Sequence, residues 1–89
     1  MKRFYNYRKW VKNADKEDLE QFFNKIIIAA GFEVLQVVQQ DIPGKGYSKI
    51  YLLAEGHLAV HIIQNKTFIQ LSSLDENKYL AFRKYIRFI

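Results

Sequence analysis

Side chains able to do nucleophilic or acid–base chemistry gather between positions 46 and 61 of the 89-residue chain. Ser48, Glu55, His57 and His61 all fall in this stretch, which reads GYSKIYLLAEGHLAVH. A serine close to a histidine can act as a nucleophile with its base, and a carboxylate can orient the histidine or accept a proton. The spacing of these residues is therefore the first feature to explain.

The stretch resembles the self-processing segment of the bacterial S-adenosylmethionine decarboxylases, whose pattern is roughly Gly-x-Ser-Gly-x-x-Leu-Leu-x-Glu-Ser-His-x-x-x-His. The residues in register with that pattern are Gly46, Ser48, Leu52, Leu53, Glu55, His57 and His61. The resemblance is specific over residues 46–61, and in the order of elements it covers most of the chain. It also implies a further C-terminal strand that this shorter chain lacks.

The resemblance implies a self-cleavage reaction for which this chain lacks a required atom. In the family, the hydroxyl of the serine that follows the glutamate attacks the glutamyl carbonyl, and β-elimination then leaves a pyruvoyl cofactor. Gly56 occupies that position here. Because glycine has no side chain, we expect no pyruvoyl cofactor and no active decarboxylase. Ser48 lies several residues upstream on the neighbouring predicted strand and does not replace the missing hydroxyl.

Ser48 and His61 match two family residues that assist processing. With a two-residue turn at Glu55-Gly56, Ser48 would lie opposite Ile63 and diagonal to His61, and Leu53 would pair with Leu58. Alternation along a strand places His57, Ala59, His61 and Ser48 on one face.

A second family residue is also missing. The family's proton donor is a cysteine on the following strand, whereas this chain has no cysteine and offers Ser72 or Ser73 there. The resemblance therefore predicts vestigial positions at Ser48, Glu55, Gly56 and His61, and ligand-binding candidates at Ser48, Glu55, His57, His61 and Ser72.

Two other kinds of site are less well supported by the residue pattern. His57 and His61 stand four residues apart, which on a strand separates them by about 13 Å. A zinc ion needs three or four convergent ligands, so we expect no metal site. A hydrolytic Ser48–His61 pair would need a third orienting group, and the sequence places neither Glu55 nor Asp41 beside the histidine.

Composition sets limits on location and partners. The chain has a net charge of +5, no cysteine and 16% aromatic residues. No signal peptide or membrane span is evident, so we expect a cytoplasmic protein. Thirteen Phe and Tyr residues are more than one small core hides, which favours a homodimer or a heterodimer with a homologue. Basic residues alternate with Phe4, Tyr5, Tyr7 and Trp10, and we interpret them as an amphipathic strand rather than a nucleic-acid site.

The periodicity predicts one domain over residues 1–89, with the α+β order β-α-β-β-β-β-α. A mainly antiparallel sheet would carry both helices on one face, as a two-layer sandwich. The expected strands cover 4–12, 32–40, 47–54, 57–63 and 67–72, and the expected helices cover 16–30 and the segment after Asp75. Asp15 and Asp75 are the expected N-caps, and Gly31 the expected helix end.

Three functions remain open at this point. The favoured one is a non-cleaving relative of the decarboxylases that binds a small ligand, such as S-adenosylmethionine or another amine, or a homologous subunit. The second is a pyruvoyl-independent enzyme, such as a lyase acting on S-adenosylmethionine, with Glu55 and His61 as its groups. The third is a basic nucleic-acid-binding module that uses the N-terminal cluster.

Overall fold

Five strands and two helices make up the part of the chain that the computed structural model describes, residues 3–12 and 15–87. In chain order they are β1 (Tyr5–Lys12), α1 (Lys16–Ala29), β2 (Val34–Ile42), β3 (Gly46–Leu53), β4 (Gly56–Ile63), β5 (Lys66–Ser73) and α2 (Glu76–Ile86). The predicted order is confirmed. The main difference is at β2, which begins two residues later than expected and continues through Ile42, so that Asp41 is a strand residue.

Both helices begin at aspartate caps, as the sequence predicts. The Asp15 carboxylate accepts hydrogen bonds from the backbone N–H groups of Glu17 and Asp18 at 2.9 and 3.2 Å. Asp75 accepts from Lys78 N–H at 3.0 Å. These bonds satisfy donors that the first helical turn leaves without partners. Gly31 follows α1 with a φ of +88°, a left-handed conformation that glycine adopts without steric cost.

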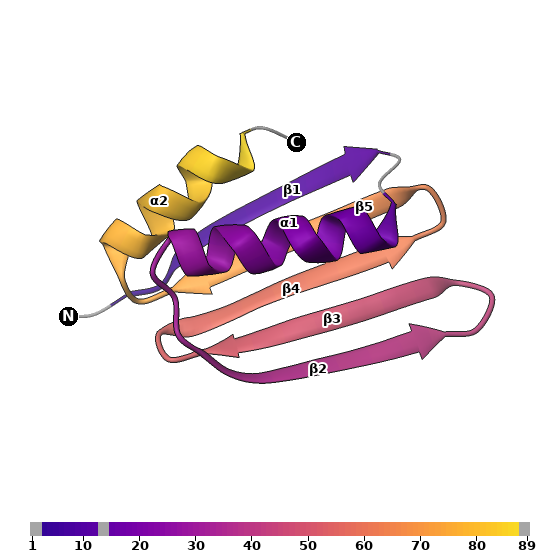
Figure 1. Ribbon diagram of the computed structural model, residues 1–89, viewed down its shortest axis with the longest axis horizontal. Coiled ribbons are helices and arrows are strands. Elements are labelled where there is room, and N and C mark those ends of the chain that lie inside the picture. Colours follow the sequence, from indigo (N-terminus) through magenta and orange to yellow (C-terminus); the bar gives the residue numbers. More distant parts are fainter. Residues whose placement is uncertain (1–2, 13–14, 88–89) are drawn as a thin grey trace.

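The sheet is antiparallel throughout, with strand order β1-β5-β4-β3-β2. The three hairpins β2–β3, β3–β4 and β4–β5 supply three of the four strand contacts, and β1 closes the sheet against β5. The N-terminal strand and β2 are therefore the two edges, and β4 lies at the centre (Figure 1). The β3–β4 hairpin, which carries the family-like stretch, is thus held on both sides by other strands.

Both helices lie on one side of the sheet (Figure 1), and the core fills the space between the helices and the sheet. Phe23 and Ile27 of α1 and Phe82 of α2 are at most 1% exposed. They pack with alternate residues of the central strands, Tyr51, Leu53, Leu58, Val60, Ile69 and Leu71. The intervening strand residues point to the opposite side, which no element of the described chain covers. We call this side the open face.

The helices do not reach every strand. All nine residues of β2 are exposed, because the core lies under α1 and α2 over the other strands. Neither helix in the described part of the chain is long or apolar enough to cross a membrane.

Candidate functional site

The β3–β4 hairpin has a tight turn of Ala54 and Glu55, and Gly56 is the first residue of β4. Gly56 has a φ of +156°. A β-carbon added there would lie 1.9 Å from the carbonyl oxygen of Ser72 on β5. Two heavy atoms cannot approach so closely without bonding, so any side chain at position 56 requires the backbone of β4 or β5 to move. Position 56 thus has no hydroxyl, because it is a glycine, and the backbone around it leaves no space for a side chain.

This geometry corrects the register expected from the sequence. Ser48 pairs directly with His61, two residues away from the predicted partner Ile63, and Leu58 pairs with Tyr51 rather than with Leu53. The prediction used Gly56 as a turn residue, whereas the structure uses it for close approach of two backbones. A shift of two residues keeps every side chain on its face, so the predicted sharing of one face by Ser48 and His61 is confirmed.

Ser48 and His61 form a hydrogen-bonded pair on the open face. The distance between Ser48 Oγ and His61 Nδ1 is 2.8 Å. The imidazole lies nearly parallel to the Phe68 ring, with centroids 6.5 Å apart and an interplanar angle of 18°. Neither acidic candidate for a third group contacts His61: Asp41 pairs with Lys16 at 3.8 Å, and Glu55 binds α2. The pair thus lacks the carboxylate that a hydrolytic triad requires.

Glu55 is tied to the start of α2 through both its backbone and its side chain. Its carbonyl oxygen accepts a hydrogen bond from Leu74 N–H at 2.8 Å, and its Oε1 lies 2.7 Å from Lys78 Nζ. The hydrogen bond to Glu55 raises the pKa of Lys78, against the opposing effect of burial. Glu55 Oε2 is buried and has no partner among the described residues. The residue before Gly56 therefore helps to fix the turn against the helix.

His57 and Ser72 face each other across β4 and β5, but they do not form a hydrogen bond. Ser72 Oγ instead donates to Asn6 Oδ1 of β1 at 2.6 Å. Ser73 is fully buried and points to the other side, where its hydroxyl bonds the backbone of Asp75 at 3.0 Å. At the place where the family resemblance expects a proton donor, the first serine braces the sheet and the second supports the start of α2.

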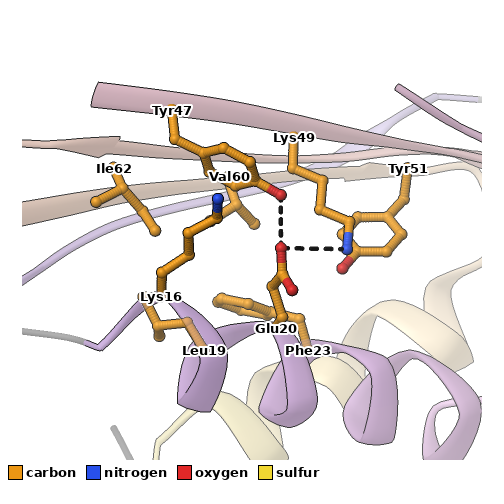
Figure 2. Close-up of a pocket in the computed structure, with 9 residues that line it drawn as sticks. All are labelled: Lys16, Leu19, Glu20, Phe23, Tyr47, Lys49, Tyr51, Val60 and Ile62. Atoms are coloured by element: carbon orange, nitrogen blue, oxygen red, sulfur yellow. Dashed lines mark hydrogen bonds and ion pairs between the residues drawn. The ribbon is translucent and has the colours of Figure 1, made fainter. Parts of the chain in front are cut away.

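A separate small crevice opens between α1 and β3 (Figure 2), with a volume of about 10 Å³. Tyr47 donates a hydrogen bond to Glu20 at 2.6 Å, and Lys49 lies 3.9 Å from the same carboxylate. Burial, and then the hydrogen bond to Glu20, raises the pKa of Tyr47. The Lys16 ammonium lies 4.0 Å from the centre of the Tyr47 ring.

The crevice and the Ser48–His61 pair lie on opposite sides of the sheet, because Tyr47 and Lys49 alternate with Ser48 along β3. Tyr47 and Tyr51 are both buried. The candidate site residues of the hairpin therefore form two separate groups. Ser48 and His61 are in contact on the open face, while Glu55 is held at the end of the hairpin by α2.

The fold and the hairpin place this chain in a known class. The family model for S-adenosylmethionine decarboxylase matches residues 6–82, and the chain therefore belongs to that family. Its structure is similar to the crystal structure of the adenosylmethionine decarboxylase from Aquifex aeolicus VF5, with a TM-score of 0.71 and 18% sequence identity. That similarity covers 93% of this chain and 74% of the Aquifex chain, and at this identity it shows a shared fold. No curated protein matches the sequence.

Several residues that shape the site carry no signal in the sequence. Lys78, the partner of Glu55, is 23 residues away and resembles any other helix lysine. Asn6, the partner of Ser72, lies 66 residues away. Phe68 contacts His61 only because of the β4–β5 register. A sequence pattern could have found the face of Phe68 but not its neighbour, because strand pairing decides which side chains meet.

Proposed function

We propose that this protein is a non-cleaving member of the S-adenosylmethionine decarboxylase family that acts by binding. The first partner is a homologous subunit, in a homodimer or a heterodimer, and the second is a small ligand such as S-adenosylmethionine or a related amine. The observation that carries the proposal is the contact at Gly56, where a β-carbon would lie 1.9 Å from the Ser72 carbonyl oxygen. The cytoplasm, where the family substrate is made and used, is the proposed setting.

Self-cleavage meets two further obstacles beside the absent hydroxyl. The Glu55 carbonyl, which a nucleophile would have to attack, is held by Leu74 N–H at 2.8 Å. Ser48 Oγ is hydrogen-bonded to His61 and lies on the open face of β3, several residues along the hairpin from this carbonyl. The chain therefore supports an uncleaved hairpin and no pyruvoyl cofactor.

A patch of exposed aliphatic side chains supports binding of a homologous subunit. We call it the aliphatic edge patch; it comprises Val34, Leu35, Val37 and Val38 of β2 with Ile50 and Leu52 of β3, each between 40% and 58% exposed. β2 is also an edge strand, so its outer backbone groups are free to pair with another strand. Val38, Ile50 and Leu52 lie on the open face, whereas Val34 and Val37 lie on the helix-covered side of the same edge. Exposed apolar surface of this kind marks interaction sites. A second chain with the same patch satisfies both features.

The small-ligand alternative uses the open face near the hairpin, where Ser48, His57, His61 and Ser72 point to the same side. Glu55, also a ligand candidate in the sequence, is engaged by Lys78. This separation weighs against the lyase alternative, which needs Glu55 and His61 to act on one substrate. The binding alternative needs only the open face.

Intact mass spectrometry and light scattering test the proposal together. The protein should give a single species of the full-length mass, and light scattering at micromolar concentration should show a dimer. Val38→Lys with Ile50→Lys should give a monomer with unchanged thermal stability, since both residues are exposed. As a matched control, Ile28→Lys with Leu80→Lys changes two exposed helix residues and should leave the dimer intact.

The remaining outcomes separate the alternatives. Two fragments, the second with a carbonyl-blocked end, would overturn the non-cleaving assignment. A wild-type monomer would remove the subunit arm, and heat on titration with S-adenosylmethionine by calorimetry would then establish the ligand arm. Conversion of S-adenosylmethionine during incubation, with loss of turnover in Glu55→Gln, would establish the lyase instead.

A further inference from the structure

The two edges of the sheet differ in how well they are protected against pairing with another strand. β1 carries one arginine and two lysines, and charged side chains of this kind discourage pairing at an edge. β2 contains no Lys, Arg, Pro or Gly, and its single charge is Asp41. A bulge between Val34 and Gln36 protects only the start of β2. The outer side of β2 is therefore open to another strand from residue 36 to residue 42.

The residues of β2 are arranged symmetrically about Val38. Gln36 and Gln40 stand two positions before and two positions after it, in the sequence VLQVVQQDI. Two copies of β2 that pair antiparallel about Val38 would place Val38 opposite Val38, and Gln36 of each copy opposite Gln40 of the other. Directly opposed side chains contact each other, and a glutamine amide can both donate and accept a hydrogen bond. β2 therefore suits a second copy of itself.

The charges of β2 agree with this arrangement. Asp41 would lie near Leu35 of the other copy, and the two Asp41 residues, six positions apart, would be about 20 Å from each other. That distance exceeds the ~10 Å screening length at 0.1 M salt, and Lys16 already lies 3.8 Å from Asp41. β1 fails the same comparison, because self-pairing about its centre would put Arg8 opposite Lys9, and opposed like charges destabilise a sheet.

We propose that two copies of this chain pair antiparallel through β2, centred on Val38, and form one continuous sheet of ten strands, five from each copy. Pairing there satisfies the free backbone groups of both edges and brings the two aliphatic edge patches together across a two-fold axis. Removal of their apolar surface from water stabilises the contact. The inference rests on the proposed subunit binding, and it names the partner as a second copy of the chain rather than a different homologue.

Disulfide cross-linking tests this pairing directly, because the chain has no cysteine of its own. Val37 and Gln39 lie on the helix-covered side of β2, and the pairing puts Val37 of each copy opposite Gln39 of the other. Opposed Cα atoms are about 4.5–5.5 Å apart, within the roughly 4.4–6.8 Å of a disulfide. Val37→Cys with Gln39→Cys in one chain should therefore become mostly covalent dimer on oxidation, seen by intact mass spectrometry and by denaturing gel.

The single variants test the register. Val37→Cys alone, or Gln39→Cys alone, places its two thiols on diagonal positions about 7–8 Å apart, beyond the span of a disulfide, and should stay monomeric in the same gel. Ile50→Cys is a matched control, because Ile50 is as exposed as Val37, at 42% and 44%. Ile50 lies one strand in from the edge, so it would be about 14 Å from its copy and should not cross-link.

Four results would overturn the inference. A dimer by light scattering without covalent dimer of the double variant would exclude edge pairing and leave the proposed subunit binding in place. Equal cross-linking of either single variant would exclude the register about Val38. Cross-linking through Ile50→Cys in place of the double variant would assign the dimer to the open face. A wild-type monomer would remove the subunit arm of the proposed function and this inference together.

Discussion

The two faces of the sheet differ in how their charges are paired and in how far their apolar side chains are buried. Under the helices, the Glu20 carboxylate binds Tyr47 and Lys49, and the large apolar side chains are almost fully buried. On the open face, Lys12 and Lys66 face each other without an acid, and Trp10 is more than half exposed. The covered face accounts for folding, whereas the open face keeps features that cost stability. Such features are expected where a protein binds something else.

The largest expected effect tests whether the close approach of β4 and β5 at Gly56 requires a residue without a side chain. Gly56→Ser should lower the free energy of unfolding by about 3 kcal/mol or more, in the range of severe steric substitutions, because its β-carbon overlaps the Ser72 carbonyl oxygen. The protein should also stay uncleaved. Thermal and urea denaturation measure the first effect, and intact mass measures the second.

Gly44→Ser is the matched control for Gly56. Gly44 also has a positive φ, +73°, but no heavy atom lies within 4 Å of an added β-carbon. The expected cost is therefore only the backbone strain, about 1–2 kcal/mol. A Gly56→Ser protein as stable as Gly44→Ser, or one that cleaves itself, would show that the strands relax easily around a side chain.

The turn at Gly56 also shows how far the sequence could predict the site. Hydrophobic periodicity and two aspartate caps were sufficient for the element order, because these are local signals. The register was wrong by two residues, because the sequence does not reveal whether a glycine serves a turn or a close backbone approach. The alternation of Arg8, Trp10 and Lys12 was visible in the sequence. The ring contacts of Phe68 with Trp10 and with His61 were not, because they depend on pairing between distant strands.

The next effect comes from the covered face, at Tyr47. Tyr47→Phe removes the hydrogen bond to Glu20 and should cost about 1–2 kcal/mol at neutral pH. The wild type should also lose stability above about pH 10. The pKa of the Tyr47 hydroxyl is raised in the folded state above the ordinary value of 10.0. The unfolded chain therefore loses this proton first, and the stabilisation declines as the pH rises.

This alkaline loss can reach about 1.4 kcal/mol per pH unit for one proton. Urea denaturation between pH 9 and 11 should show a shallower decline in Tyr47→Phe than in the wild type. Tyr85→Phe, which removes a hydroxyl without a hydrogen bond among the described residues, should keep the wild-type decline. Equal declines in all three proteins would mean that Tyr47 ionises as freely in the fold as outside it.

A smaller effect is expected on the open face, at the Ser48–His61 pair. Ser48→Ala removes a partly buried hydrogen bond of 2.8 Å and should cost about 1 kcal/mol. A double-mutant cycle with His61→Phe isolates the coupling of the two side chains. A coupling near zero would show that the pair adds nothing to stability and that its geometry is an incidental result of strand register.

The smallest change should test the repulsion between two opposed lysines on the open face. Lys66→Glu places a carboxylate directly opposite Lys12, which replaces a repulsive cross-strand pair with an attractive one. The free energy of unfolding should rise by about 0.2–1 kcal/mol. Lys45→Glu in the β2–β3 loop makes the same charge change away from Lys12 and should not raise stability. If Lys66→Glu lowered stability instead, the two lysines would not repel each other in the folded protein.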